Sequence, residues 1–156
     1  MHVFLGHPPA AICPAFLNVD KRVDQSGTAA VEDVLLVQFA LHKIGEKIGA
    51  LPAFWGPIFL KVPVNGKVDS NTVEAIKTFQ RGRPDNPRGT NTNVVDGMVS
   101  RAHGYVYGQG DWTIYDLNVQ LAIRFPEVYP RIDNIPGCPG ALSKAVRKAF
   151  LGGLEH

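Results

Sequence analysis

Two short stretches of the chain gather residue types that can bind a polar ligand. The first, residues 64–72, reads VNGKVDSNT and leads from a turn into a helical pattern. A helix start exposes backbone N–H groups, and amide and hydroxyl side chains beside it suit a ligand rich in amides and carboxylates. The candidate binding residues of this stretch are Asn65, Gly66, Asp69, Asn71 and Thr72. Arg81, at the end of the same helical pattern, could pair with a ligand carboxylate.

The second stretch repeats the first 31 positions further along the chain: an apolar residue, Asn or Asp, Gly, any residue, then Val. Tyr105, Tyr107 and Trp112 follow it and could form an aromatic platform for the ligand. Turn and cap geometry also explains these motifs, because Asn-Gly and Asp-Gly readily take the positive φ angles of tight turns and Asp69 can cap a helix. Both interpretations are open from the sequence.

The sequence predicts no catalytic residue, metal site or cofactor. HExxH, GxSxG, Walker and GxGxxG patterns are absent. Both cysteines lie beside prolines, without a helix N-terminus that would lower a thiol pKa. Cys13 and Cys138 could pair in a disulfide that closes a loop of about 125 residues, or remain as two buried thiols.

Helical periodicity predicts the elements that position these residues. The predicted helices span 28–48, 69–80, 112–124 and 141–151. We expect Thr28 to cap the first helix, Asp69 the second, and Asp111 or Thr113 the third. Any strands should be short and close to the two turns.

The remaining segments have no helical pattern. Residues 1–27 contain several Pro and Gly residues and are interpreted as an extended N-terminal arm. We expect residues 28–125 to form the main domain. Residues 126–153 are expected to add a loop and a C-terminal helix that packs on this domain. The last three residues, 154–156, are interpreted as an affinity-tag remnant. Phe54, Trp55 and Phe59 form either a packed hydrophobic cover or one exposed surface for a protein partner.

The order of these motifs resembles the peptidoglycan-binding-domain family, a three-helix module found beside many cell-wall hydrolases. The matching residues are Gln38 and Leu41, then Asn65-Gly66, Thr72, Ala75-Ile76 and Phe79-Gln80, then residues 95–99. The resemblance covers about residues 31–123. The chain departs from the family pattern in having Asp69-Ser70 where Gly-Pro is usual, Ser100 and His103 after the second turn, and longer loops at 50–63 and 81–93.

This resemblance implies a mainly α fold: a three-helix bundle with long ordered loops, an N-terminal arm and an extra C-terminal helix. It implies a non-catalytic module that binds the stem peptide or glycan of peptidoglycan and targets an attached or partnered activity to the wall, in the periplasm or outside the cell. The alternative is a protein-interaction or scaffold domain of a secretion-system or phage protein, which keeps the fold without wall binding.

Length and charge narrow the classes of partner. The 156 residues predict one domain with its own core. A formal charge of +2 and a pI near 8.6 argue against a nucleic-acid partner, which usually requires a concentrated basic face. No apolar run approaches the ~20 residues of a membrane span. The N-terminal residues, MHVFLGHPPAAICP, lack an early Lys or Arg and make a poor secretory signal.

Overall fold

The computed structural model describes residues 1–5, 13, 15–49, 51–82, 94–104, 106–107, 110–152 and 154–155. Its helices are α1 (Val31–Glu46), α2 (Trp55–Leu60), α3 (Ser70–Arg81), α4 (Thr113–Arg124), the 3-10 turn η1 (Ile132–Asn134) and α5 (Gly140–Leu151). Its strands are β1 (His2–Leu5), β2 (Ala15–Asn18), β3 (Val106–Tyr107), β4 (Gly110–Asp111) and β5 (Leu154–Glu155). The predicted mainly helical class is confirmed.

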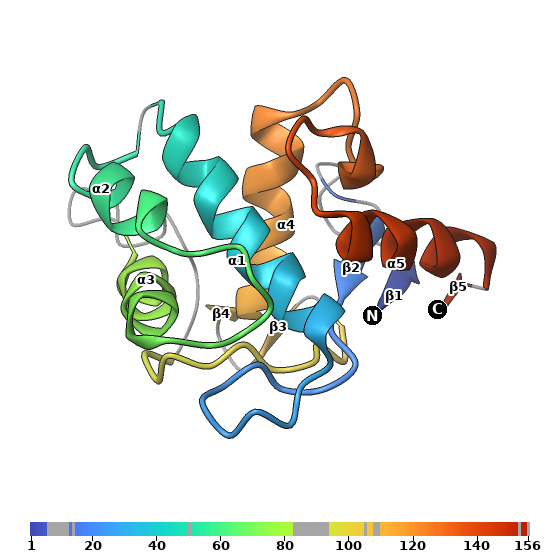
Figure 1. Ribbon diagram of the computed structural model, residues 1–156, viewed down its shortest axis with the longest axis horizontal. Helices are drawn as coiled ribbons and strands as arrows, with labels where there is room; N and C mark the ends of the chain where they lie inside the picture. Colours follow the sequence, from blue (N-terminus) through green and yellow to red (C-terminus); the bar gives the residue numbers. More distant parts are fainter. Residues whose placement is uncertain are drawn as a thin grey trace.

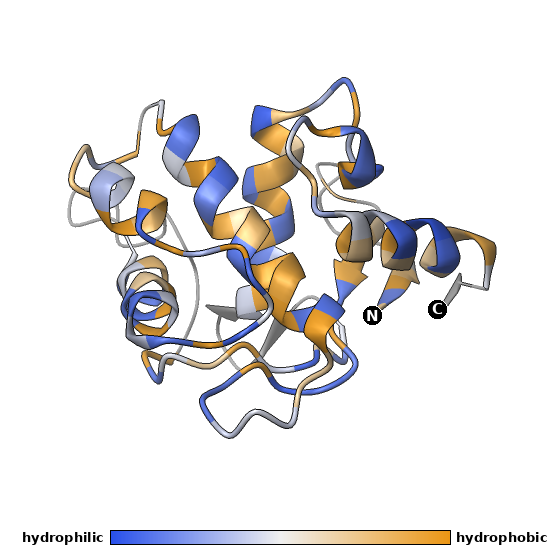
Figure 2. Cartoon of the chain, in the orientation of Figure 1, coloured by the Kyte–Doolittle hydropathy of each residue, from blue (hydrophilic) through white to orange (hydrophobic). Residues whose placement is uncertain are grey.

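Helix α1 is the centre of the fold and packs against α2, α3, α4 and α5 (Figure 1). Every residue from Asp33 to Leu41 is buried, which explains why this stretch is apolar nearly all round in sequence. A helix buried on several sides has little need of a polar face. The outer helix α5, by contrast, buries one stripe of Leu142, Val146 and Ala149 and alternates hydrophilic with hydrophobic residues along its length (Figure 2).

The N-terminal arm that we predicted over 1–27 is wrong, because its strands belong to the core. Strands β1 and β2 pair antiparallel, and β5 adds to β1 in parallel, giving the order β2-β1-β5. Val3, Phe16 and Leu17 are fully buried. The expected tag remnant likewise pairs with β1 through Leu154 and Glu155. Strands of only four residues give too little alternation to be recognised in sequence.

Helix α2 was also missed, since the 50–63 segment contains three prolines and was expected to be a loop. Pro57 lies in the first turn of this helix, where a missing N–H breaks no intrahelical bond. Close packing holds the helix in place: a Cβ on Gly45 of α1 would lie 2.8 Å from Phe59 Cβ. Gly45 therefore allows α1 and α2 to approach each other.

Two of the expected helix caps are absent. The N-cap of α1 is Ala30 and that of α4 is Trp112, and neither makes a side-chain cap bond. Thr28 instead shares a hydrogen bond with the Ser26 hydroxyl. The predicted Asp69 cap is confirmed. Among the described residues, no helix is long and apolar enough to cross a membrane.

Candidate functional site

A buried glutamine on α1 holds the first turn, defined here as residues 64–68. Gln38 Oε1 accepts hydrogen bonds from the backbone N–H groups of Asn65 at 3.1 Å and Gly66 at 2.9 Å. Its Nε2 donates to the carbonyl oxygen of Lys67 at 2.7 Å and to Thr72 Oγ1 at 3.1 Å. One side chain thus joins α1, the turn and the start of α3.

Gln80 on α3 holds the second turn, residues 95–99, in the same way. Its Oε1 accepts from the N–H groups of Asp96 at 3.1 Å and Gly97 at 2.9 Å. Its Nε2 donates to the Met98 carbonyl oxygen at 2.9 Å and to Thr113 Oγ1 at 3.2 Å, at the start of α4. The sequence repeat is therefore a structural repeat: the glutamine of one helix fixes the turn that leads to the next helix.

The glycine of each turn meets a valine of the preceding long helix. Gly66 has φ +80° and Gly97 has φ +73°, a region that side chains with a Cβ disfavour. A Cβ on Gly66 would lie 2.7 Å from Val31 Cγ1, and one on Gly97 would lie 2.9 Å from Val73 Cγ1. Each valine precedes its glutamine by seven residues, two helical turns, so the two contacts are equivalent.

The structure gives three of the predicted binding residues internal roles. Asp69 caps α3, accepting from Thr72 N–H at 2.8 Å and from the Thr72 hydroxyl at 2.7 Å. Thr72 is fully buried and Gly66 is buried too, so neither is available to a ligand. The prediction that Thr72 and Gly66 contact ligand is wrong, because Gln38 and the helix cap occupy their polar groups.

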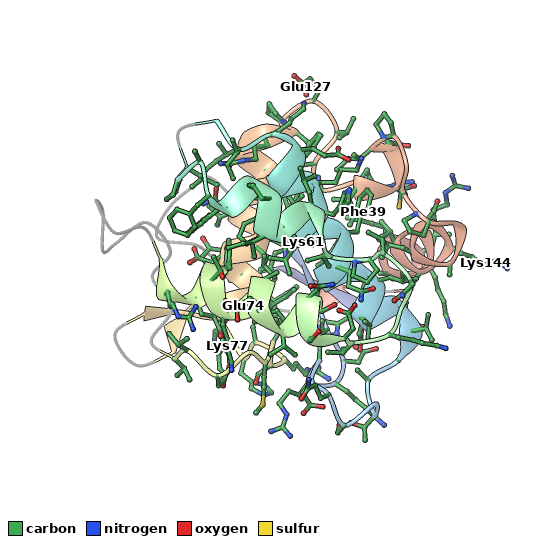
Figure 3. All side chains as sticks on the ribbon, turned by 60° about the vertical axis from the view of Figure 1, so that its left-hand side comes forward. Phe39, Lys61, Glu74, Lys77, Glu127 and Lys144 are labelled. Carbon is green, nitrogen blue, oxygen red and sulfur yellow. The ribbon has the colours of Figure 1, made fainter. Side chains whose placement is uncertain are left out.

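Three other predicted residues are exposed. Asn65 lies at the first turn, where its Oδ1 accepts from Lys67 N–H at 3.0 Å. Asn71 and Arg81 lie on α3, on the same stripe as Glu74, and Arg81 Nη1 lies 3.5 Å from Glu74 Oε1. Figure 3 shows Glu74 and Lys77 of this helix together on one side of the molecule. Asn71, Glu74 and Arg81 form one exposed face of α3, called here the α3 face.

The predicted aromatic platform is described only in part. Tyr105 and the side chain of Tyr107 lie outside the described residues; the Tyr107 backbone belongs to β3. Trp112 is half-buried and packs on the hydrophobic core, with its ring edge-on to His103 at 5.9 Å between centroids. Much of the indole is thus used in packing.

Sequence reasoning missed a groove of about 220 Å³ between the second turn and the loop after β2. It is lined by Asp24, Gln25, Ser26, Val73, Asp96, Gly97 and Met98. The isolated bridge Val23–Val99 ties the two walls together through two backbone hydrogen bonds of 2.9 and 3.0 Å. The loop falls within residues 1–27, which are interpreted from the sequence as an extended arm, and its Asp-Gln-Ser-Gly sequence indicates only a turn.

The aromatic surface predicted for a protein partner is not formed. Trp55 and Phe59 are fully buried, with ring centroids 5.3 Å apart, and both stack near Phe79 in the core. Phe54 remains 51% exposed. The packed-cover interpretation of this segment is confirmed for Trp55 and Phe59.

The cysteines are free, so the disulfide considered from the sequence is not present. Cys13 Sγ lies 3.0 Å from the Tyr129 hydroxyl and is buried in the core. Burial raises the pKa of Cys13 to about 11, and burial together with the nearby Asp133 carboxylate raises the pKa of Cys138 to about 11. Neither thiol is a ready nucleophile. The described residues include no group of three or more His, Cys, Asp and Glu that could hold a metal ion.

Comparison of the chain with family models, with curated protein sequences and with solved structures finds no match in any of the three. The geometry within this chain therefore carries the evidence about its function. Its strongest feature is the pair of equivalent glutamine-held turns, each leading into the start of a helix.

Proposed function

We propose that this chain is a non-catalytic module that binds peptidoglycan and brings an attached or partnered activity to the bacterial cell wall. The supporting observation is the repeated arrangement of Gln38 and Gln80 with their turns. The motif residues behind the family resemblance make equivalent contacts in both copies. Helices α1, α3 and α4 then correspond to a bundle of the peptidoglycan-binding type.

The proposed binding surface combines the α3 face with the groove at the second turn. Asn65 and Asn71 offer amides to the stem peptide, and Arg81 offers a guanidinium to a stem carboxylate. Val73 lines the groove, and Lys77 one turn further along α3 packs against Gly97. The two parts are therefore adjacent, and together they would make a shallow site for an extended ligand. A wall-binding module of this kind acts in the periplasm or outside the cell.

A mapping experiment tests this surface. The double variant Asn71→Ala/Arg81→Ala removes one amide and one cation from the α3 face. Asn134→Ala/Lys144→Ala likewise removes one amide and one cation, from η1 and α5. In Figure 3 Lys144 lies at the right-hand edge, whereas Glu74 lies left of the centre. We expect only the first variant to reduce co-sedimentation with insoluble sacculi, by about tenfold for two lost charge-assisted or amide contacts. Equal binding by both variants would place the site elsewhere.

A protein-interaction or scaffold role is the second candidate. Phe54 and Leu60, at the two ends of α2, are 51% and 46% exposed, and exposed large apolar side chains are typical of partner surfaces. The change Phe54→Ser should leave sacculus binding unchanged under the first proposal. If the folded wild-type protein does not co-sediment with sacculi, the protein-interaction role is favoured instead.

A further inference from the structure

The groove at the second turn carries two carboxylates on facing walls. Asp24 lies on the loop after β2, and Asp96 belongs to the turn. Asp24 accepts from the Ser26 N–H at 2.9 Å and from the Ser26 hydroxyl, and these bonds hold the pKa of Asp24 below its usual range. The carboxylate is therefore charged at neutral pH.

Asp96 lines the groove, and one oxygen of its carboxylate makes no hydrogen bond to another described residue. Its Oδ1 accepts from Gln80 Nε2 at 3.1 Å and from Met98 N–H at 2.9 Å. Oδ1 makes every hydrogen bond between the Asp96 side chain and another described residue, and Asp96 is exposed. Oδ2 is thus the atom that can accept from a ligand.

The other walls are apolar or already paired. Val73 and Met98 supply aliphatic surface. Two cations lie near the acids: Arg22 Nε donates to Asp24 Oδ2 at 2.6 Å, and Lys77 packs its aliphatic chain against Gly97. Arg22 offsets the charge of Asp24, so Asp96 is the stronger attraction for a positive ligand.

We propose that this groove binds the free side-chain amine of the diamino acid in the peptidoglycan stem peptide. The ammonium donates to Asp96 Oδ2 while the aliphatic part of the same side chain lies against Val73 and Met98. This inference rests on the proposed wall-binding function and names the chemical group that the site selects. Carboxylate-lined walls disfavour an anionic group at the same place.

The first turn supplies a matched substitution. Asn65 stands where Asp96 stands in the second turn, and its Oδ1 accepts from Lys67 N–H as Asp96 Oδ1 accepts from Met98 N–H. Asp96→Asn should therefore keep the turn and remove only the charge. Glu127→Gln, exposed in the segment between α4 and η1 and outside both the groove and the α3 face, is the control for loss of one negative charge.

The test measures co-sedimentation of the wild type, Asp96→Asn and Glu127→Gln with native sacculi and with sacculi whose free amines are acetylated. We expect acetylation to weaken wild-type binding by about fivefold, as for an exposed ion pair, and Asp96→Asn to weaken binding to native sacculi equally. Acetylation should cause no further loss for Asp96→Asn, because both changes remove the same contact.

Three results would overturn the proposal in different ways. If the wild type binds native and acetylated sacculi equally strongly, the contact with the amine is rejected and the proposed wall binding stands. No wild-type binding to either preparation would reject wall binding, and the amine contact with it. A loss in Glu127→Gln equal to that in Asp96→Asn would show a general charge effect and also reject the assigned site.

Discussion

Replacing Gln38 by Leu is expected to lower the free energy of unfolding by about 2–4 kcal/mol. Gln38 is fully buried and makes hydrogen bonds to four groups of the first turn and α3. Asn65 and Lys67 are exposed, so water can replace its bonds to their backbone groups. The Gly66 N–H is buried and would lose its partner, at a cost of about 1–3 kcal/mol, with the other lost bonds adding about 1 kcal/mol.

The assay is urea unfolding followed by circular dichroism, together with amide hydrogen exchange. Gln120→Leu is the control, since Gln120 is also buried and its side chain bonds Arg124 on its own helix. We expect this control to cost less than about 1 kcal/mol. Exchange should quicken at Gly66 in Gln38→Leu and stay unchanged at Gly97. Equal costs for the two variants, or equal loss of protection at both glycines, would refute the role of Gln38 as the anchor of one turn.

Three further predictions concern the glycine turns, the thiols and acid stability. Gly66→Ala should lower stability by about 1–3 kcal/mol in thermal unfolding because of its positive φ and the contact with Val31, and adding Val31→Ala should recover only the steric part. Thiol titration with an aromatic disulfide at pH 8 should find Cys13 unreactive in the folded protein and two free thiols in urea, because its raised pKa of about 11 leaves little thiolate. Hydrogen bonding to Arg131 lowers the pKa of Asp133, so its stabilisation is present above the unfolded pKa of about 4 and is lost as pH falls through the folded pKa. Melting temperatures between about pH 2.5 and 6 should therefore fall less steeply for Asp133→Asn than for the wild type.

The sequence predicted the long helices because their apolar residues recur at helical spacing. The observed α1, α3, α4 and α5 begin and end within three residues of the expected bounds. Asp69 was predictable as a cap because its partner, the Thr72 N–H, is three residues away. Interactions of this kind join residues that are close in sequence, so they can be predicted from a short stretch of the chain.

The contacts that define the site join residues far apart in the chain. Gln38 bonds residues 27 and 28 positions away, and Gln80 bonds residues 16 and 17 positions away across an intervening loop. A lone glutamine gives no signal for such a partner. The order of the motifs indicated the two turns. It could not show that Thr72 is buried and hydrogen-bonded to Gln38 and Asp69, or that the loop after β2 completes a groove.

The N-terminal strands illustrate the same limit. Asn118 of α4 accepts from Leu17 N–H at 3.0 Å and donates to the Leu17 carbonyl oxygen at 2.9 Å, so an amide side chain pairs with the strand like a neighbouring backbone. Asn18 bonds Ala102 in the same two-way fashion. Buried amide side chains, rather than long strands, hold this region against the helices. Hydrophobic periodicity in the sequence does not predict such hydrogen bonds.

The most direct test of wall binding is sedimentation of the purified wild-type protein with insoluble peptidoglycan sacculi at low salt and at about 150 mM salt. Circular dichroism should first establish that the protein is folded and helical. We expect retention in the pellet at both salt concentrations, because salt does not screen amide and apolar contacts. A folded protein that remains in the supernatant at both salts would contradict the proposed function and leave the fold, with its two glutamine-held turns, in need of a different ligand.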